Sequence, residues 1–210
     1  KLRRARRYYG GRVLGNRLRE GDNSEKVTDF YDLVDPCRLK RAFVTTFSHD
    51  PNMLLLLFGE CLGSAAFEEL ILVDHYDTER QLSGIHNYPG GSPKIKLVFP
   101  HFQVKSKYGI QHAKLMLLHY PRRLRIIISS CNLDDIDSIL LDKSGGSQVF
   151  FVADTNLMVG FDNNNTNRLY GFGISLRNFI HQLRPLNPHD ESMNSRSNAI
   201  FTRWDTLLAT

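Results

Sequence analysis

The stretch GIQHAKLMLLHYPRRLRIIISSCNL, residues 109–133, contains two apolar runs separated by Pro121-Arg122-Arg123. Short continuous apolar runs of this kind are typical of buried strands, and a three-residue connection is short enough for a hairpin. A histidine and a lysine precede the first run, and an asparagine follows the second. Such polar groups cost free energy when they are buried without partners. The stretch therefore predicts two core strands and a use for these three side chains.

The three side chains are His112, Lys114 and Asn132. Residues two apart in a strand point to the same face, so we expect His112 and Lys114 to project together. If the two runs pair as a hairpin, Asn132 returns close to the level of His112. An imidazole can act as a nucleophile or proton shuttle near neutral pH, whereas an ammonium and a carboxamide donate hydrogen bonds to phosphate oxygens. A lone H-x-K occurs by chance in many proteins, but this combination indicates a phosphate-handling site that requires no metal.

Charges are unevenly distributed along the chain. The net charge is +5, and residues 1–19 carry eight Lys or Arg and no acid. This run is either a nuclear-targeting or nucleic-acid-binding arm or a solvated basic tail. Residues 81–133 contain no Asp or Glu, but eight Lys or Arg and four histidines. Because a nearby carboxylate repels phosphate, this acid-free window predicts a pocket for a polyanion.

Length and composition limit the possible classes of protein. The chain has 210 residues, 41% of them hydrophobic and 23% charged, which allows one sizeable core in a single domain or one lobe of a larger protein. The best membrane-span candidate, Met53–Phe58, is far too short to cross a bilayer, so we expect no membrane partner. Three scattered cysteines favour a reducing, intracellular compartment over a disulfide framework or a zinc site.

Predicted strands and helices alternate along the chain. Asp50 and Pro51 predict the start of a helix that runs through Met53–Phe58 and ends near Gly59 or Gly63. Residues 83–93, rich in Gly and Pro, predict a loop. The other predictions are strands at Ala42–Phe47, Leu70–Val73, Ile95–Phe99, Ala113–Tyr120, Leu124–Ser130 and Val149–Val152, and a helix at Gly173–Leu183. This order predicts an α/β sandwich with a mixed β-sheet.

The motif HAK at 112–114, with Asn132 of SSCN 18 residues after the lysine, resembles the H-x-K…N half-motif of the phospholipase D superfamily. Within that superfamily it is most similar to the tyrosyl-DNA phosphodiesterases, which share the absence of an Asp at the position of His119. The segments AFVTTF, LILVDH and QVFFVADTN are similar as well, so the resemblance covers roughly residues 40–185. It implies that residues 40–210 form the first lobe of a two-lobed phospholipase D-like fold, after a basic N-terminal arm and connecting segment at residues 1–39.

The resemblance also implies an activity, namely hydrolysis of a DNA 3′-phosphotyrosyl or other 3′-blocking bond during DNA repair in the nucleus. His112 matches the histidine that attacks phosphorus and forms a covalent phosphohistidine, while Lys114 and Asn132 match the residues that bind the phosphate oxygens. Tyr108 matches an aromatic residue that stacks on DNA, and Gln148 a glutamine that supports the site. The implied partner is single-stranded or double-stranded DNA with a 3′ adduct, and no metal or other cofactor is implied.

The family uses two H-x-K…N halves, and this sequence contains one. None of the seven other histidines is followed two residues later by a lysine. Three explanations are open: the N-terminal half of a longer enzyme, a homodimeric nuclease or lipid hydrolase with one site shared between copies, or a degenerate DNA-binding copy without turnover. Gln111 departs from the histidine that usually precedes the nucleophile, so its role is open.

Overall fold

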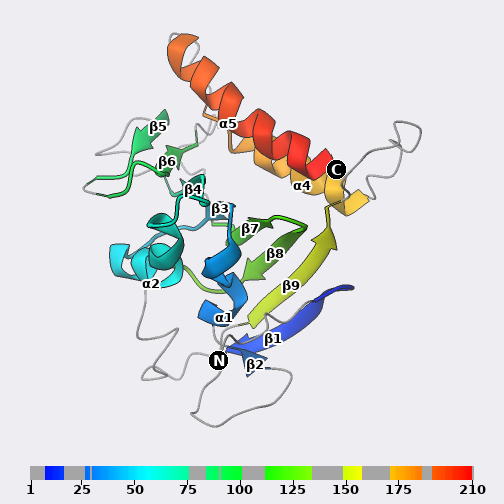
Figure 1. Ribbon diagram of the computed structural model, residues 1–210. Coiled ribbons are helices and arrows are strands. Elements are labelled where there is room, and N and C mark those ends of the chain that lie inside the picture. The colour runs from blue at the N-terminus through cyan, green and yellow to red at the C-terminus, as the bar shows by residue number, and fades with distance from the viewer. Residues whose placement is uncertain are drawn as a thin grey trace.

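A mixed sheet of nine strands forms the centre of the protein (Figure 1). The computed structural model describes residues 8–16, 27–28, 30–75, 84–89, 91–100, 112–133, 149–157, 171–185 and 191–209. Its strands are β1 (Arg12–Asn16), β2 (Val27–Thr28), β3 (Arg41–Thr45), β4 (Glu69–Val73), β5 (Gly84–Asn87), β6 (Ile95–Phe99), β7 (Leu115–Tyr120), β8 (Arg123–Ser129) and β9 (Val149–Asn156). They lie in the order β2-β1-β9-β8-β7-β3-β4-β6-β5. Strands β3, β4 and β6 run parallel to one another, whereas β7, β8 and β9 form an antiparallel meander next to β3.

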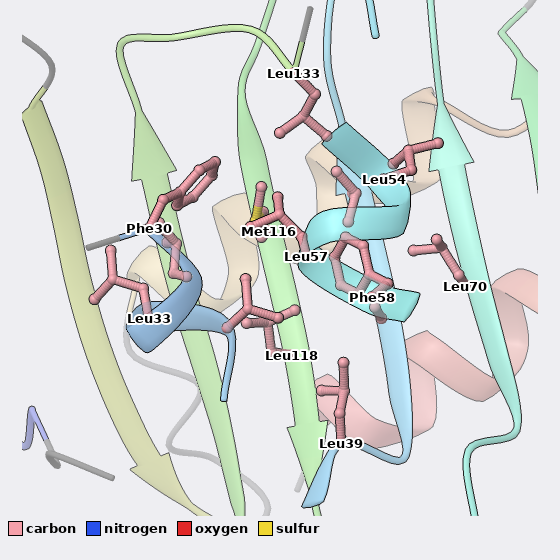
Figure 2. Packing of buried hydrophobic residues seen from close by; sticks show 14 of the residues in the cluster. Phe30, Leu33, Leu39, Leu54, Leu57, Phe58, Leu70, Met116, Leu118 and Leu133 are labelled. Carbon is pink, nitrogen blue, oxygen red and sulfur yellow. The ribbon is translucent and has the colours of Figure 1, made fainter. Parts of the chain in front are cut away.

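Helices cover both faces of this sheet. They are α1 (Phe30–Val34), the 3-10 helix η1 (Pro36–Arg38), α2 (Pro51–Leu62), α4 (Gly171–Gln182) and α5 (Glu191–Ala209). On one face, α1 and α2 pack through residues such as Phe30, Leu57 and Phe58 onto the strands, as Figure 2 shows. On the other face, α4 and α5 lie together and bury Ile180 and Trp204 (Figure 1). None of the described helices is long and apolar enough to cross a membrane.

Strand β7 shows why the sequence around the site is so apolar. Met116 and Leu118 belong to the core under α1 and α2, whereas Leu115 and Leu117 belong to the core under α4 and α5. A strand that is buried on both faces reads as a continuous apolar run rather than an alternating one. The hairpin of β7 with β8, turning at Pro121 and Arg122, confirms the predicted pairing of the two runs.

Most predicted elements are present near their expected bounds. The start of α2 is as predicted, because the Asp50 side chain accepts the Asn52 N–H at 2.8 Å with Pro51 in the first helical position. The predicted strand Ala42–Phe47 is observed at Arg41–Thr45, and Leu70–Val73 and Ile95–Phe99 lie within β4 and β6. The strand predicted from Val149 extends further, to Asn156.

Two predictions differ from the structure. The segment 83–93 was expected to be a loop, but Gly84–Asn87 forms the edge strand β5, whose exposed His86 and Asn87 are the polar residues that a sheet edge favours. Residues 1–39 were expected to be an arm and connecting segment outside the lobe. Instead β1 pairs with β9, and Phe30 of α1 stacks on Phe150 with ring centroids 5.0 Å apart. The described parts of that segment thus share the sheet and the core with the rest of the chain.

Candidate active site

His112 and Lys114 lie together at the start of β7. The Lys114 ammonium Nζ is 2.9 Å from Nδ1 and 3.2 Å from Nε2 of the His112 ring, and it donates to the His112 carbonyl at 3.0 Å. The regular strand begins only at Leu115, so these two residues belong to the connection that leads into it rather than to the predicted strand. The predicted proximity of the two side chains is nevertheless confirmed. His112 is exposed and Lys114 is half-buried, which leaves the imidazole accessible to a substrate.

The β7–β8 hairpin brings Asn132 to the same end of the sheet. Leu115 pairs with Ile128, and the Ser129 N–H donates to the Lys114 carbonyl at 3.0 Å. After β8 the chain turns through Ser129 to Cys131, where the Ser129 hydroxyl accepts the Cys131 N–H at 3.0 Å. Asn132 follows this turn and is half-buried. His112 and Lys114 thus precede the first strand of the hairpin, and Asn132 follows its second strand, so all three lie at the open end of one hairpin.

The segment after Asn132 is anchored to the connection between β3 and α2. The Leu133 N–H donates to the Ser48 carbonyl at 3.2 Å, and the Leu133 carbonyl accepts the Asp50 N–H at 2.7 Å. The backbone N–H and carbonyl of Leu133 therefore both hydrogen-bond to the connection between β3 and α2. Because Asn132 lies between this anchor and the Ser129–Cys131 turn, its backbone is held on both sides.

Two aromatic contacts at the site were not predicted. Phe47, expected at the end of a strand, lies beyond the end of β3 and packs against the His112 ring with centroids 5.2 Å apart. The same Phe47 ring stacks on His75 at 4.9 Å. A phenyl wall beside an exposed imidazole restricts the orientations that the imidazole can adopt. Sequence alone offers no signal for this contact, since it depends on how β3 and β7 are placed in the sheet.

A second group of titratable side chains lies next to Leu133. His49 Nδ1 is 2.6 Å from an Asp74 carboxylate oxygen, and His49 Nε2 is 3.2 Å from the Tyr88 hydroxyl. The other Asp74 oxygen accepts the His75 N–H at 2.6 Å. Burial, together with the negative charges of Asp50 and Asp74, raises the pKa of Tyr88. The His49–Asp74 bond joins the segments that follow β3 and β4, at the same end of the sheet as His112, and the Tyr88 side chain reaches His49 from the residue after β5.

A cavity of about 550 Å³ opens beside His112 and Lys114. Ser129 and Ser130 contribute polar groups on the hairpin side. The opposite wall comes from α4 and is mainly apolar, with Phe172, Leu176 and Phe179 beside one polar residue, Ser175. The site therefore offers hydrogen-bond donors and a nucleophile at one side and a surface for an apolar or aromatic group at the other.

The acid-free window 81–133 does not form one basic pocket in the part of the chain that is described. Arg125 donates to both Asp154 oxygens, at 2.8 and 2.9 Å, and Arg123 donates to Asp154 at 3.0 Å and to Asp35 at 2.9 Å. Burial alone would raise the pKa of Asp154, but the hydrogen bonds and charges of these arginines hold it below its usual range. These two cations are therefore neutralised inside the fold, and among the described residues that line the cavity the lysine or arginine is Lys114.

The remaining site predictions lie outside the described residues. Tyr108, Gln111 and Gln148 are among them, so their predicted roles stay predictions. Within the described ranges, no group of three or more His, Cys, Asp or Glu side chains is arranged to hold a metal ion. The polar side chains that line the cavity beside His112, those of Lys114, Ser129 and Ser130, can donate hydrogen bonds to an anion.

Comparison with known proteins places this geometry in a family. A family model described as tyrosyl-DNA phosphodiesterase matches residues 14–191. A crystal structure of a variant yeast tyrosyl-DNA phosphodiesterase is similar, with a TM-score of 0.59 at 15% identity, covering 95% of this chain and 43% of that chain. A further yeast structure of that enzyme gives a TM-score of 0.55 at 16% identity, over 89% of this chain and 41% of that chain. The chain thus spans less than half the length of these proteins, and its fold is the predicted α/β one. No curated protein sequence matches the chain.

Proposed function

The chain belongs to the tyrosyl-DNA phosphodiesterase family, and we propose that it is one catalytic lobe of a hydrolase that opens a DNA 3′-phosphotyrosyl bond. The observation that carries the proposal is the contact between Lys114 Nζ and the His112 imidazole, 2.9 Å at Nδ1, at the mouth of a cavity. A cation beside an imidazole binds a non-bridging phosphate oxygen and so holds the phosphorus against the ring nitrogen that attacks. The proposed setting is DNA repair in the nucleus.

The chemistry assigned to these residues is nucleophilic. A nitrogen of His112 attacks phosphorus, the N–P bond forms, and the bond from phosphorus to the tyrosyl oxygen breaks. Lys114 and Asn132 donate hydrogen bonds to the non-bridging oxygens, on which negative charge increases in the transition state. Water then attacks the phosphohistidine, releases a 3′-phosphate and restores the imidazole.

The leaving tyrosyl oxygen requires a proton in the first step. The family's second H-x-K half supplies that acid, and no second H-x-K is present in this sequence. We therefore propose that a second lobe, in a longer chain or in another copy of this chain, completes the site. The apolar α4 wall of Phe172, Leu176 and Phe179 suits the tyrosyl ring or a nucleobase of the substrate.

Two residues outside the described ranges complete the proposal. Tyr108, four residues before His112, would stack on a base of single-stranded or double-stranded DNA. Gln148, one residue before β9, would hydrogen-bond to groups of the site. Both assignments come from the resemblance.

An oligonucleotide with a 3′-(4-nitrophenyl) phosphate tests the proposal on this chain, because nitrophenolate leaves without being protonated. We expect the unaltered chain to release nitrophenolate once and to keep the oligonucleotide as a covalent adduct that survives a neutral denaturing gel. His112→Ala should form no adduct. Lys114→Ala should slow its formation roughly 100-fold or more, as expected for loss of a group that stabilises developing charge.

The matched control is His86→Ala, which removes an exposed histidine from the edge strand β5. It should form the adduct at the rate of the unaltered chain. An adduct that persists in His112→Ala would remove His112 from the nucleophile role. Salt-dependent DNA binding without any adduct, unchanged in His112→Ala, would instead identify a non-catalytic DNA-binding copy. Cleavage of plain DNA or of lipid by a self-associated chain would identify a homodimeric nuclease or lipid hydrolase.

A further inference from the structure

Thr45, the last residue of β3, and Thr46, which follows it, are buried beside an apolar run of that strand. Their exposed fractions are 2% and 0%, next to Ala42, Phe43 and Val44. A buried hydroxyl group is costly unless it is hydrogen-bonded, and a valine would fill the same volume without that cost. Two such hydroxyls in succession therefore require an explanation in terms of the bonds they make.

The Thr45 hydroxyl holds the segment that carries His112 and Lys114. It donates to the Ala113 carbonyl at 2.8 Å and accepts the Leu115 N–H at 3.0 Å. These two backbone groups lie on either side of Lys114. Thr45 and Leu115 form the last register pair between β3 and β7, so the hydroxyl continues the hydrogen bonding where the backbone ladder ends.

The Thr46 hydroxyl holds the segment that carries Asn132. It accepts the Leu133 N–H at 3.3 Å and donates to the Ser48 carbonyl at 2.6 Å. That carbonyl also accepts the Leu133 N–H, at 3.2 Å. Thr46 thus holds Leu133, the residue after Asn132, and also the Ser48 carbonyl to which the Leu133 N–H is hydrogen-bonded.

Successive residues at the end of a strand point to opposite faces of the sheet, so one dipeptide can reach two segments that lie far apart in sequence. We infer that Thr45 and Thr46 are positioning residues, Thr45 for His112 and Lys114, and Thr46 for Asn132. The expected effect on the rate of adduct formation rests on the proposed function. The expected effect on the positions of His112, Lys114 and Asn132 does not. In the proposed reaction both hydroxyls act through the backbone and neither touches the phosphate.

The test uses the valine variants Thr45→Val and Thr46→Val, which remove one hydroxyl each, and the serine variants, which restore it. Displacements on the scale of 1 Å can cost about 100-fold in rate, so each valine variant should form the nitrophenyl-phosphate adduct roughly 10–100-fold more slowly. Thr45→Ser and Thr46→Ser should return to within about threefold of the unaltered rate, since the hydroxyl is what matters. Rates are corrected for the folded fraction measured by thermal unfolding.

Nuclear magnetic resonance provides a readout that does not depend on catalysis. Thr45→Val should shift the ring signals of His112 and leave the side-chain amide of Asn132 unchanged, whereas Thr46→Val should do the reverse. Ser197→Ala, which removes a fully buried hydroxyl from α5 on the helical layer, should change neither. These signal changes test the inference even if the unaltered chain forms no adduct. The absence of an adduct would overturn the proposed function but not the inference.

Two results would overturn the inference itself. One is a folded Thr45→Val or Thr46→Val protein that keeps both the unaltered rate and the unaltered His112 and Asn132 signals. The other is a loss of rate in the serine variant that the valine variant of the same position does not share, which would show that the γ-methyl group rather than the hydroxyl is responsible.

Discussion

At the scale of single residues, His119 is a histidine held neutral inside the sheet. It lies near the end of β7 opposite Arg41, and its Nδ1 has no hydrogen-bond partner among the described residues. Burial, with the neighbouring positive charge of Arg41, lowers the pKa of His119 to about 4. The folded protein therefore binds a proton at this ring less readily than the unfolded chain, whose histidine pKa is about 6.5.

This pKa difference predicts a pH dependence of stability. Between pH 6.5 and 4 the unfolded chain binds the proton and the folded protein does not, so the free energy of unfolding decreases as the pH falls through this window. From pH 7 to pH 5 the contribution of His119 should be a loss of about 2 kcal/mol. Urea unfolding at the two pH values measures it, with His119→Leu expected to lose this part of the pH dependence.

The control for this prediction is His86→Gln, at an exposed position on β5. It should keep the pH dependence of the unaltered chain. A His119→Leu variant whose stability changes with pH as much as that of the unaltered chain would contradict the neutral, buried assignment of this ring.

The site residues that sequence could predict are those related by local spacing. His112 and Lys114 are two residues apart, and Asn132 returns through one hairpin, so both relations follow from strand geometry. Phe47 and Thr45 were not predicted because their contacts join residues far apart in sequence, 70 positions for Thr45 and Leu115. For Arg123 and Arg125 the acid-free window misled in the same way, since the acids that neutralise these two arginines come from outside the window.

At the scale of elements, apolar runs and helix caps predicted the central strands and α2, whereas β1, β2, α1, β5 and α5 were not predicted. The edge strand β5 is short and carries polar residues, so it reads as a loop. Helix α5 is largely polar, and its buried Ile200, Trp204 and Leu208 lie four residues apart among many charged and polar neighbours. Such a pattern marks one narrow face of a helix and is easily overlooked beside the wider apolar runs.

Strand β1 gives a prediction at this scale. Its Leu14 is 2% exposed and belongs to the core, whereas Val13, on the opposite face, is 66% exposed. Leu14→Ala should lower the free energy of unfolding by about 2–5 kcal/mol, the usual cost of removing a buried leucine side chain. Val13→Ala, the matched control in the same strand, should cost less than about 1 kcal/mol. Urea unfolding measures both, and equal small effects would mean that this strand is an arm outside the core after all.

At the scale of the whole molecule, one buried charged network joins α1 and the segment before β1 to the neighbouring strands β8 and β9. Arg125 of β8 pairs with Asp154 of β9 and donates to the Leu33 carbonyl of α1 at 2.7 Å. Asp154 also accepts the Tyr8 N–H at 2.7 Å, just before β1. Both members of the central pair have fully buried side chains. The arginines that sequence analysis assigned to an anion pocket therefore stabilise the assembly of the lobe.

Removing the Asp154 charge should consequently destabilise the whole lobe. Asp154→Asn leaves the fully buried Arg125 guanidinium without its counter-ion, which should lower the free energy of unfolding by about 3–5 kcal/mol.

Because the pKa of Asp154 lies below its usual range, the stability that its charge contributes is present above about pH 4 and is lost as the pH falls below it. Acid unfolding followed by circular dichroism should show that step in the unaltered chain and lack it in Asp154→Asn. The double variant Arg125→Met with Asp154→Leu should recover part of the loss, since it removes the uncompensated guanidinium charge. The rest should remain lost, because the Tyr8 N–H and Arg123 no longer have Asp154 as an acceptor. A single variant within about 1 kcal/mol of the unaltered chain would show that this network does not hold the lobe together.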